Sequence, residues 1–197
     1  MQFYMHKEND KSDNELVALA LNDPNYFGIL MERYEGKLLT YIRRISSVTH
    51  EDAEDILQNS FLKAYQNLNS FDGELTFSSW MYRIVHNETV SMWRKNKSRP
   101  QGNMVYVDDD FLERIVDTAD IVSDMDKEFL KDVIDKLLKN MDDKYREILI
   151  LKYIEDKSYD EISDILKKPA GTVATHLNRA KKQFRELYDE QKIKSLS

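Results

Sequence analysis

The fold of this chain is decided by residues 153–188, which read YIEDKSYDEISDILKKPAGTVATHLNRAKKQFRELY. Ser158 is followed three residues later by Glu161, the spacing of a capping box, and this pair predicts that a helix begins here. Pro169 cannot continue that helix, and Gly171 permits a tight bend before the next one. Apolar residues then recur at spacings of four, three, four and three, which predicts one buried helical stripe: Val173, Leu177, Ala180, Phe184 and Leu187. Two short helices joined by a tight turn predict a helix-turn-helix, whose second helix can enter the major groove of DNA.

The charges of the second helix favour DNA binding over a plain helical hairpin. Residues 167–185 hold six basic side chains and no acidic one, although the whole chain has a formal net charge of −7. A solvated basic face on an ordinary hairpin is the alternative interpretation. The exposed positions nearest the turn are short or carry an amide, which suits close approach to base edges: Thr172, Ala174, Thr175 and Asn178. The basic residues farther along suit phosphate groups: Arg179, Lys181, Lys182 and Arg185.

The composition indicates an all-α protein of the cytoplasm. One third of the 197 residues are charged, only five are glycine and three proline, and the periodic segments have helical spacing. Cysteine is absent, which excludes disulfides and thiolate metal sites and fits a reducing compartment. The N-terminal residues MQFYMHKENDKSDNE do not resemble a signal peptide, and no apolar run approaches the roughly 20 residues of a membrane span. We therefore expect no membrane insertion.

The charge distribution predicts two small helical domains joined by an acidic linker. Residues 1–99 carry a net charge of −2, residues 100–127 carry −6, and residues 128–197 carry +1. The middle segment lacks sustained periodicity and by itself is typical of a solvated acidic tether, whereas helical spacing returns from Lys131. A chain with this balance is expected to bind DNA weakly alone and to need a partner.

The first domain is expected to open with three helices. Ser12 and Glu15 form another capping box, and Pro24 suits the first helical position after Asp23. A third helix is expected after Thr49, with acidic residues 51–55 beside the positive end of its dipole. These acids could be imagined as a metal site, but the dipole explains them without a metal. The polar residues 67–76 predict a loop.

The helix expected over residues 77–97 has three faces. One is apolar and predicts core positions, one is polar and partly basic, and one is aromatic. Basic groups beside aromatic rings suit a single-stranded nucleic acid, although the aromatic residues could instead pack against the preceding helix. The core face holds Phe77, Trp80, Met81 and Ile84, the basic stripe Arg83, Asn87, Val90 and Arg94, and the aromatic face Tyr82, His86 and Trp93.

Taken in order, these segments resemble bacterial sigma factors of the sigma-70 family, in the extracytoplasmic function (ECF) group, which have only the second and fourth sigma domains. DPNYFGILMERYEGKLLTYIRRI is similar to the start of the second domain, and EDAEDILQNSFLKAY to its segment that binds core RNA polymerase. FSSWMYRIVHNETVSMWRK is similar to the segment that recognises and melts the −10 element. MDDKYREILILKYIEDKSYDEISDILKKPAGTV, followed by LNRAKKQFREL, resembles the fourth domain, which reads the −35 element.

The resemblance implies roles for residues of the second domain. Asp55, Gln58 and Asn59 match positions that contact the polymerase clamp, and Asn59 departs from the glutamate usual there. Phe71 and Asn87 match positions of a pocket that captures a flipped-out −10 base. Flipping costs a few kcal/mol, which stacking worth ~1–3 kcal/mol and hydrogen bonds to the base edge can offset.

The resemblance also assigns the fourth domain and the linker. The groove-facing positions are Thr175, Asn178, Arg179 and Lys182, whereas Ala174 and His176 stand where a basic residue is common, which should lower −35 affinity. In related factors the linker threads toward channels built for polyanions. Its 28 residues can extend to about 90 Å, whereas DNA elements two helical turns apart are separated by about 70 Å.

The resemblance thus implies a sigma factor that binds core RNA polymerase and promoter DNA and helps to melt the −10 region. The family also implies an anti-sigma factor as partner. No cofactor, metal or enzyme activity is expected, because the sequence shows no catalytic triad order, metal-spaced ligand set or phosphate-cradling glycine loop. Two alternatives stay open: a helix-turn-helix regulator that acts without polymerase, and a sigma-like adaptor that docks on polymerase without reading promoters.

Overall fold

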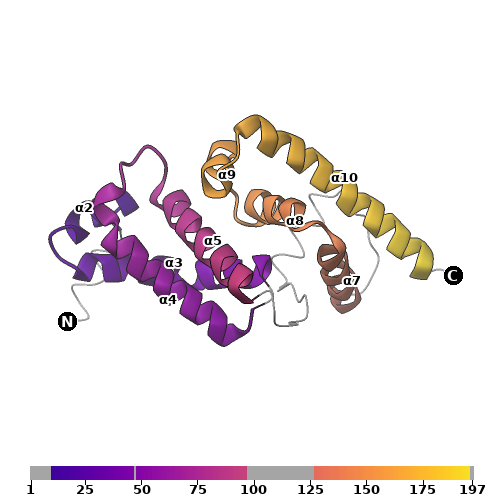
Figure 1. Cartoon of the computed structure of the whole chain (residues 1–197), viewed down its shortest axis with the longest axis horizontal. Coiled ribbons are helices and arrows are strands. Elements are labelled where there is room, and N and C mark those ends of the chain that lie inside the picture. Colours follow the sequence, from indigo (N-terminus) through magenta and orange to yellow (C-terminus); the bar gives the residue numbers. More distant parts are fainter. Residues whose placement is uncertain (1–9, 47, 97–126, 196–197) are drawn as a thin grey trace.

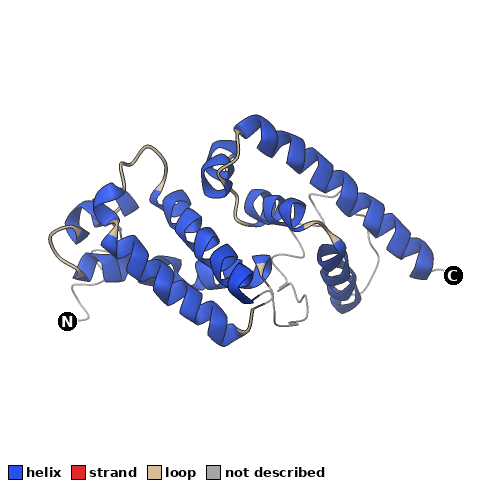
Figure 2. Cartoon of the chain, in the orientation of Figure 1, coloured by secondary structure: helices blue, strands red, loops and turns tan. Residues whose placement is uncertain are grey.

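The computed structural model describes residues 10–46, 48–96 and 127–195, and all of its regular structure in these ranges is helical (Figure 2). This confirms the all-α prediction. The α-helices are α2 (Asp13–Ala20), α3 (Asn25–Ile45), α4 (His50–Gln66), α5 (Phe77–Asn96), α7 (Lys127–Asn140), α8 (Asp143–Leu149), α9 (Tyr159–Leu166) and α10 (Ala170–Ser195). Apart from Lys127, which begins α7, the predicted linker 100–127 lies outside the described residues.

Helices α2 to α5 form an N-terminal body around one apolar core. The predicted capping box begins α2, since the Glu15 amide donates to Ser12 Oγ (3.3 Å) and the Ser12 amide donates to Glu15 Oε2 (2.8 Å). Thr49 caps α4 in the predicted place by accepting the amide of Asp52 at 3.1 Å. Pro24 has helical dihedrals directly before α3. The predicted loop 67–76 contains a short 3₁₀ turn, Leu68–Ser70, with Leu68 buried.

Helices α7 to α10 form a C-terminal body that contains the predicted helix-turn-helix. The second capping box is present, with Ser158 Oγ accepting the Glu161 amide and Glu161 Oε2 accepting the Ser158 amide. The bend, however, is not made by Gly171, which lies in the first turn of α10. Lys167 is left-handed instead (φ 52°), and the Lys168 amide donates to the Ser163 carbonyl at 3.0 Å. The prediction for Gly171 was wrong because two hydrogen bonds close the end of α9, from the Lys167 amide to the Asp164 carbonyl and from the Lys168 amide to the Ser163 carbonyl. They stabilise the left-handed conformation of Lys167 without a glycine.

The segment before the helix-turn-helix is divided into two α-helices and a π-helical turn. Helix α7 begins at Lys127, earlier than Lys131, and ends before α8. After α8 the chain makes a π-helical turn, Ile150–Ile154, in which the Glu155 amide donates to the Ile150 carbonyl at 3.0 Å. A π-turn holds one residue more than an α-turn and changes the direction of the side chains that follow.

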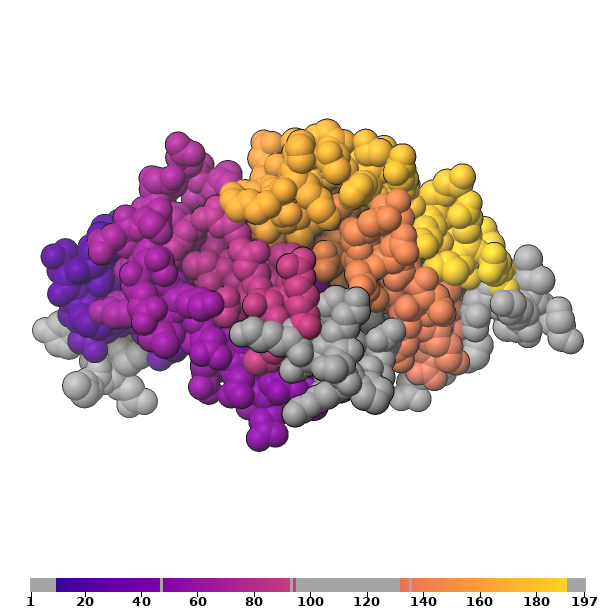
Figure 3. Space-filling view, viewed as in Figure 1, coloured from indigo at the N-terminus to yellow at the C-terminus, as the bar shows by residue number. Residues whose placement is uncertain are grey.

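The two bodies pack against one another through α5 and α9, with α8 also near α3 (Figure 1). In space-filling view the C-terminal helices are seated against α5 (Figure 3). The predicted tether therefore connects bodies that touch. Within the described ranges, no helix combines the length and apolar character needed to cross a bilayer.

Candidate nucleic-acid interfaces

Helix α10 presents a polar face to solvent. Thr175, Asn178, Arg179 and Lys182 are all exposed and recur at intervals of three, one and three residues. The opposite stripe, including Val173 and Phe184, is buried, and α10 packs on α7, α8 and α9. The face therefore carries short polar side chains near the turn and cations farther along, and all four side chains are open to solvent.

The other residues predicted for this interface are partly buried or contact neighbouring aromatic rings. Thr172 is half-buried, and Lys181 is exposed with its ammonium 4.9 Å from the centroid of the Tyr153 ring. His176 packs edge-to-face on Tyr145 (5.7 Å between centroids), and its buried Nδ1 has no hydrogen-bond partner among the described residues. Burial and nearby cations lower the pKa of His176, so the ring is neutral near pH 7 and does not add to the positive charge of the face.

The residues predicted for the −10 pocket lie at two levels, with Phe71 in the loop before α5 and Asn87 in the second half of that helix. The Phe71 ring is half-buried against Phe77 and Trp80, with centroid separations of 5.7 and 5.6 Å. Asn87 and Arg94 are exposed farther along the helix. Seven residues separate Trp80 from Asn87, which corresponds to about 10 Å along the helix axis. The structure thus places the ring and the amide about two turns apart.

Arg83, the fourth predicted −10 residue, is engaged by the C-terminal body. Its Nη1 donates to Asp164 Oδ1 at 2.7 Å and to Oδ2 at 2.9 Å. The Lys167 ammonium also donates to Asp164 Oδ1, at 2.8 Å. Burial alone would raise the pKa of Asp164, but the bonds from Lys167 and Arg83 outweigh it and hold the pKa below its usual value. The carboxylate is therefore ionised and satisfied by both cations.

Of the two alternatives for the aromatic face of α5, packing inside the protein holds for Tyr82 and His86, so neither ring is available to unstacked bases. Their exposed fractions are 3% and 8%. Tyr82 Oη donates to Glu155 Oε2 at 2.5 Å, and His86 Nδ1 lies 3.2 Å from Tyr41 Oη. Burial lowers the pKa of His86 to about 4, so the imidazole is neutral. Both rings pack inside the molecule because the C-terminal body covers this face of α5. The helical period groups the residues of a face, but it does not show whether another part of the chain covers that face. The side chain of Trp93 lies outside the described residues.

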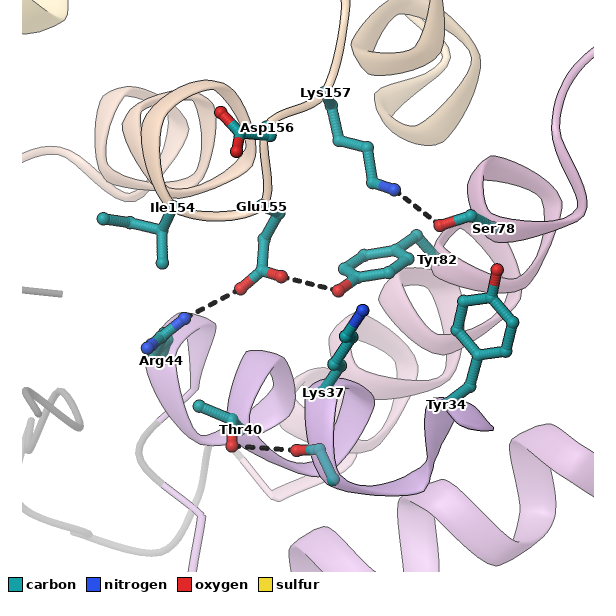
Figure 4. A pocket seen from close by; sticks show the side chains of 11 residues that line it. Tyr34, Lys37, Thr40, Arg44, Ser78, Tyr82, Ile154, Glu155, Asp156 and Lys157 are labelled. Carbon is teal, nitrogen blue, oxygen red and sulfur yellow. Dashed lines mark hydrogen bonds and ion pairs between the residues drawn. The ribbon is translucent and has the colours of Figure 1, made fainter. Parts of the chain in front are cut away.

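A polar cluster that the sequence did not reveal lines a cavity of about 490 Å³ between the two bodies (Figure 4). Glu155, placed by the π-helical turn, accepts hydrogen bonds from Arg44 Nη1 (2.9 Å) and from Tyr82. Lys157 Nζ donates to Ser78 Oγ at 2.6 Å and lies 4.3 Å from the centroid of the Tyr82 ring. Burial lowers the pKa of Lys157. Spacing could not identify this cluster, because its members come from helices far apart in the chain.

Helix α4 carries the residues predicted to contact polymerase, and all three are exposed: Asp55, Gln58 and Asn59. Leu62, one turn beyond Asn59, is 55% exposed, and Tyr65 is 40% exposed. Sequence spacing did not single out these two residues. Leu62 continues the helical spacing of Asp55 and Asn59, and a large apolar residue in that position is the sequence signal that could have identified this surface. Exposed apolar groups beside polar ones are typical of interfaces.

Comparison with known proteins places both bodies in one family. Residues 30–99 match Sigma-70 region 2, and residues 131–184 match Sigma-70, region 4. The ECF RNA polymerase sigma factor SigW of Bacillus subtilis is 34% identical over 174 residues, which are 83% of this chain and 89% of that protein. The ECF RNA polymerase sigma-E factor of Haemophilus influenzae is 28% identical over 178 residues, which are 88% of this chain and 93% of that protein.

Two solved structures share the fold. CnrH in complex with the cytosolic domain of CnrY superposes with a TM-score of 0.66 at 21% identity, covering 91% of this chain and 99% of that chain. The sigma factor RpoE of Bartonella quintana, in complex with the anti-sigma factor NepR, gives 0.63 at 21% identity, covering 83% and 96%. Since both regions match in order and SigW is similar over most of both chains, the protein belongs to the ECF group of the sigma-70 family, the sigma factors that direct RNA polymerase in transcription initiation.

Proposed function

We propose that the two bodies divide promoter recognition between them. Residues 1–99 bind core RNA polymerase and melt the −10 region, residues 128–197 read the −35 element, and the acidic linker 100–127 spans the distance between them. The observation that carries this proposal is the solvent face of α10, where Thr175, Asn178, Arg179 and Lys182 stand together. The protein acts in the cytoplasm as an initiation factor and not as an enzyme.

Polymerase binding is assigned to α4. Asp55, Gln58 and Asn59 supply hydrogen-bonding groups on one exposed surface, and Leu62 supplies an apolar contact beside them. A small apolar centre within a polar rim is the usual composition of a protein interface. The loss of charge at Asn59, compared with the glutamate usual in the family, places more of the binding energy on its neighbours.

Melting is assigned to the stripe of α5 that ends in Asn87 and Arg94. The Asn87 amide can both donate to and accept from a base edge, and Arg94 can meet phosphate. Phe71 supplies a ring edge at the other end of the helix. Arg83 takes part only after its bond to Asp164 has opened.

Run-off transcription with purified core enzyme tests the proposal. Arg179→Ala should lower transcription from a promoter that depends on its −35 element, whereas Lys136→Ala, which removes an exposed cation from α7, should not. Asn87→Ala should slow opening or change the preferred −10 base. Equal activity of Arg179→Ala and wild type at that promoter would refute the −35 assignment. Site-specific gel shifts by the protein alone, without any effect on core enzyme, would favour a polymerase-independent regulator.

An anti-sigma factor is the further partner we propose. Both similar structures are complexes, of CnrH with the cytosolic domain of CnrY in one case and of the sigma factor RpoE with the anti-sigma factor NepR in the other. Co-purification from the native host, followed by identification of the bound proteins, tests this. Recovery of core polymerase subunits with no other stoichiometric protein in uninduced cells would argue against such a partner.

A further inference from the structure

We propose that the packing of α9 on α5 is an autoinhibitory contact, in which Asp164 occupies Arg83 in place of a DNA phosphate. The free protein would then be closed, and α5 would engage the −10 strand only after α9 has moved away. This inference rests on the proposed role of α5 in melting.

The contact covers three of the four residues of one continuous polar row on the N-terminal body. Thr76, Ser79, Arg83 and Asn87 follow one another at intervals of three or four residues, so they lie along one side of α5 and of the residue before it. Helix α9 holds the first three of them and leaves Asn87 exposed. Of the residues predicted for the −10 surface, Arg83 is therefore masked, whereas Asn87 and Arg94 are open to solvent.

The groups of α9 that mask this row are carboxylates, and the groups that they mask are hydrogen-bond donors. Glu161 Oε1 accepts from Ser79 Oγ at 2.5 Å and from Thr76 Oγ1 at 3.0 Å, and Asp164 accepts from Arg83. Guanidinium and hydroxyl groups are also the donors that hold phosphate oxygens in nucleic-acid complexes. The carboxylates thus satisfy the same donors that a DNA strand would use, and strand and α9 cannot occupy them together.

A second anchor fixes the arrangement at the base of the contact. The Arg44–Glu155 ion pair is buried, with exposed fractions of 6% and 7%, and Tyr82 completes the coordination of the carboxylate. The Arg83–Asp164 pair is more exposed to solvent than the Arg44–Glu155 pair, with exposed fractions of 27% and 18%. Water therefore reaches the outer pair, and opening is expected to begin there. The inner pair restores the closed alignment when the bodies meet again.

The surfaces needed before melting stay accessible in the closed form. Asp55 and Asn59 on α4, and Arg179 and Lys182 on α10, are all exposed. Polymerase can therefore dock on α4 while α5 is masked, and separation of the two bodies on the enzyme would release Arg83. The contact would keep the free protein from binding single strands without preventing formation of the holoenzyme.

Two measurements on the full-length protein test the proposal. Because the chain has no cysteine, dyes can be attached only at introduced thiols, at Gln66→Cys on α4 and Lys136→Cys on α7, and energy transfer between them reports closure. Anisotropy of a fluorescent single-stranded oligonucleotide, spanning the −10 region of a promoter that the holoenzyme transcribes, reports masking. Asp164→Asn should lower energy transfer and tighten oligonucleotide binding by about threefold to fivefold, the upper part of the range that an exposed ion pair supplies.

The matched control is Asp160→Asn, which removes the same charge from an exposed site on the same helix. If lost repulsion alone caused tighter binding, both variants would gain equally, and the proposal would be overturned. It would also be overturned if Asp164→Asn left energy transfer unchanged. In an Arg83→Gln background, Asp164→Asn should have no further effect on closure.

The test separates this inference from the proposed function. Wild type and Asp164→Asn should both support run-off transcription at saturating core polymerase. If neither does, the sigma-factor assignment of these surfaces fails. If both do, yet Asp164→Asn binds the oligonucleotide as wild type does, only the autoinhibitory contact fails.

Discussion

Glu147 on α8 gives a prediction whose size follows from its surroundings. It lines a cavity of about 400 Å³ between the two bodies, together with His86, Arg94, Lys144, Arg146 and Lys168. Burial raises the pKa of Glu147 to about 7 from an ordinary 4.5, Asp143 adds to the rise, and Lys168 and Arg146 oppose it. The folded protein therefore holds a proton at Glu147 that the unfolded chain releases.

The sign and the magnitude follow from proton linkage. Between pH 4.5 and 7 the folded state binds more protons at Glu147 than the unfolded state does, so the contribution of Glu147 to the free energy of unfolding falls as pH rises and then levels off. The full shift corresponds to about 3 kcal/mol. The side chain keeps some contact with water through the cavity, so we expect about 1–2 kcal/mol. Glu147→Gln cannot ionise and should be more stable than wild type by this amount at pH 8.5, with little difference at pH 5.

Urea unfolding followed by circular dichroism at pH 5, 7 and 8.5 measures the effect. Glu32→Gln is the control, because it removes the same charge from an exposed position on α3. A gain that is equal at pH 5 and pH 8.5, or a gain of the same size in the control, would refute the reasoning. The ¹³C shift of the Glu147 carboxyl gives an independent check, since its titration midpoint should lie near 7.

The remaining predictions concern single sites. Gly171 lies in the first turn of α10 with open space where an alanine methyl group would lie, so Gly171→Ala should raise the free energy of unfolding by about 0.5–1 kcal/mol, whereas Gly73→Ala should lower it because φ is +76° there. Thermal melts of the two variants check this, and shifts of the same sign would contradict it. His86 is held neutral, so its own contribution to stability should be lost as pH falls from 6.5 toward 4, opposite in sign to that of Glu147, and the free energy of unfolding of His86→Gln should rise relative to wild type over this window in denaturation curves recorded at several pH values. Ser158→Ala should cost about 1 kcal/mol through loss of the cap, and an unchanged melting temperature would show that Glu161 alone maintains the helix end.

Local features of the fold could be predicted because they depend on neighbours in the sequence. Ser12 and Ser158 each bond to a glutamate three residues later, and that chemistry is fixed by spacing alone. The buried stripe of α10 likewise follows from the helical period. The turn between α9 and α10 was harder to predict, because backbone hydrogen bonds stabilise the left-handed conformation at Lys167 and these bonds do not depend on residue type.

The environment of α5 could not be predicted, since it depends on contacts between segments about 70–110 residues apart. The helical period correctly separated Arg83 from Tyr82, but it could not tell which of these faces meets solvent. Glu155 and Asp164 decide that question, and nothing near them in the sequence points to Arg44 or Arg83. The two nearly neutral net charges gave no sign of an attraction between the domains, whereas the ion pairs Arg44–Glu155 and Arg83–Asp164 join them.

The π-helical turn Ile150–Ile154 makes the seating of Glu155 depend on how the backbone is wound as well as on residue type. If the same residues were wound as a regular α-helix, the side chains beyond them would turn by about 100° around the axis. Glu155 would then miss the Arg44 guanidinium and the Tyr82 phenol although neither had been mutated. The winding of this one turn is thus a mechanical handle that changes how the two bodies are aligned and leaves the chemistry of both surfaces untouched.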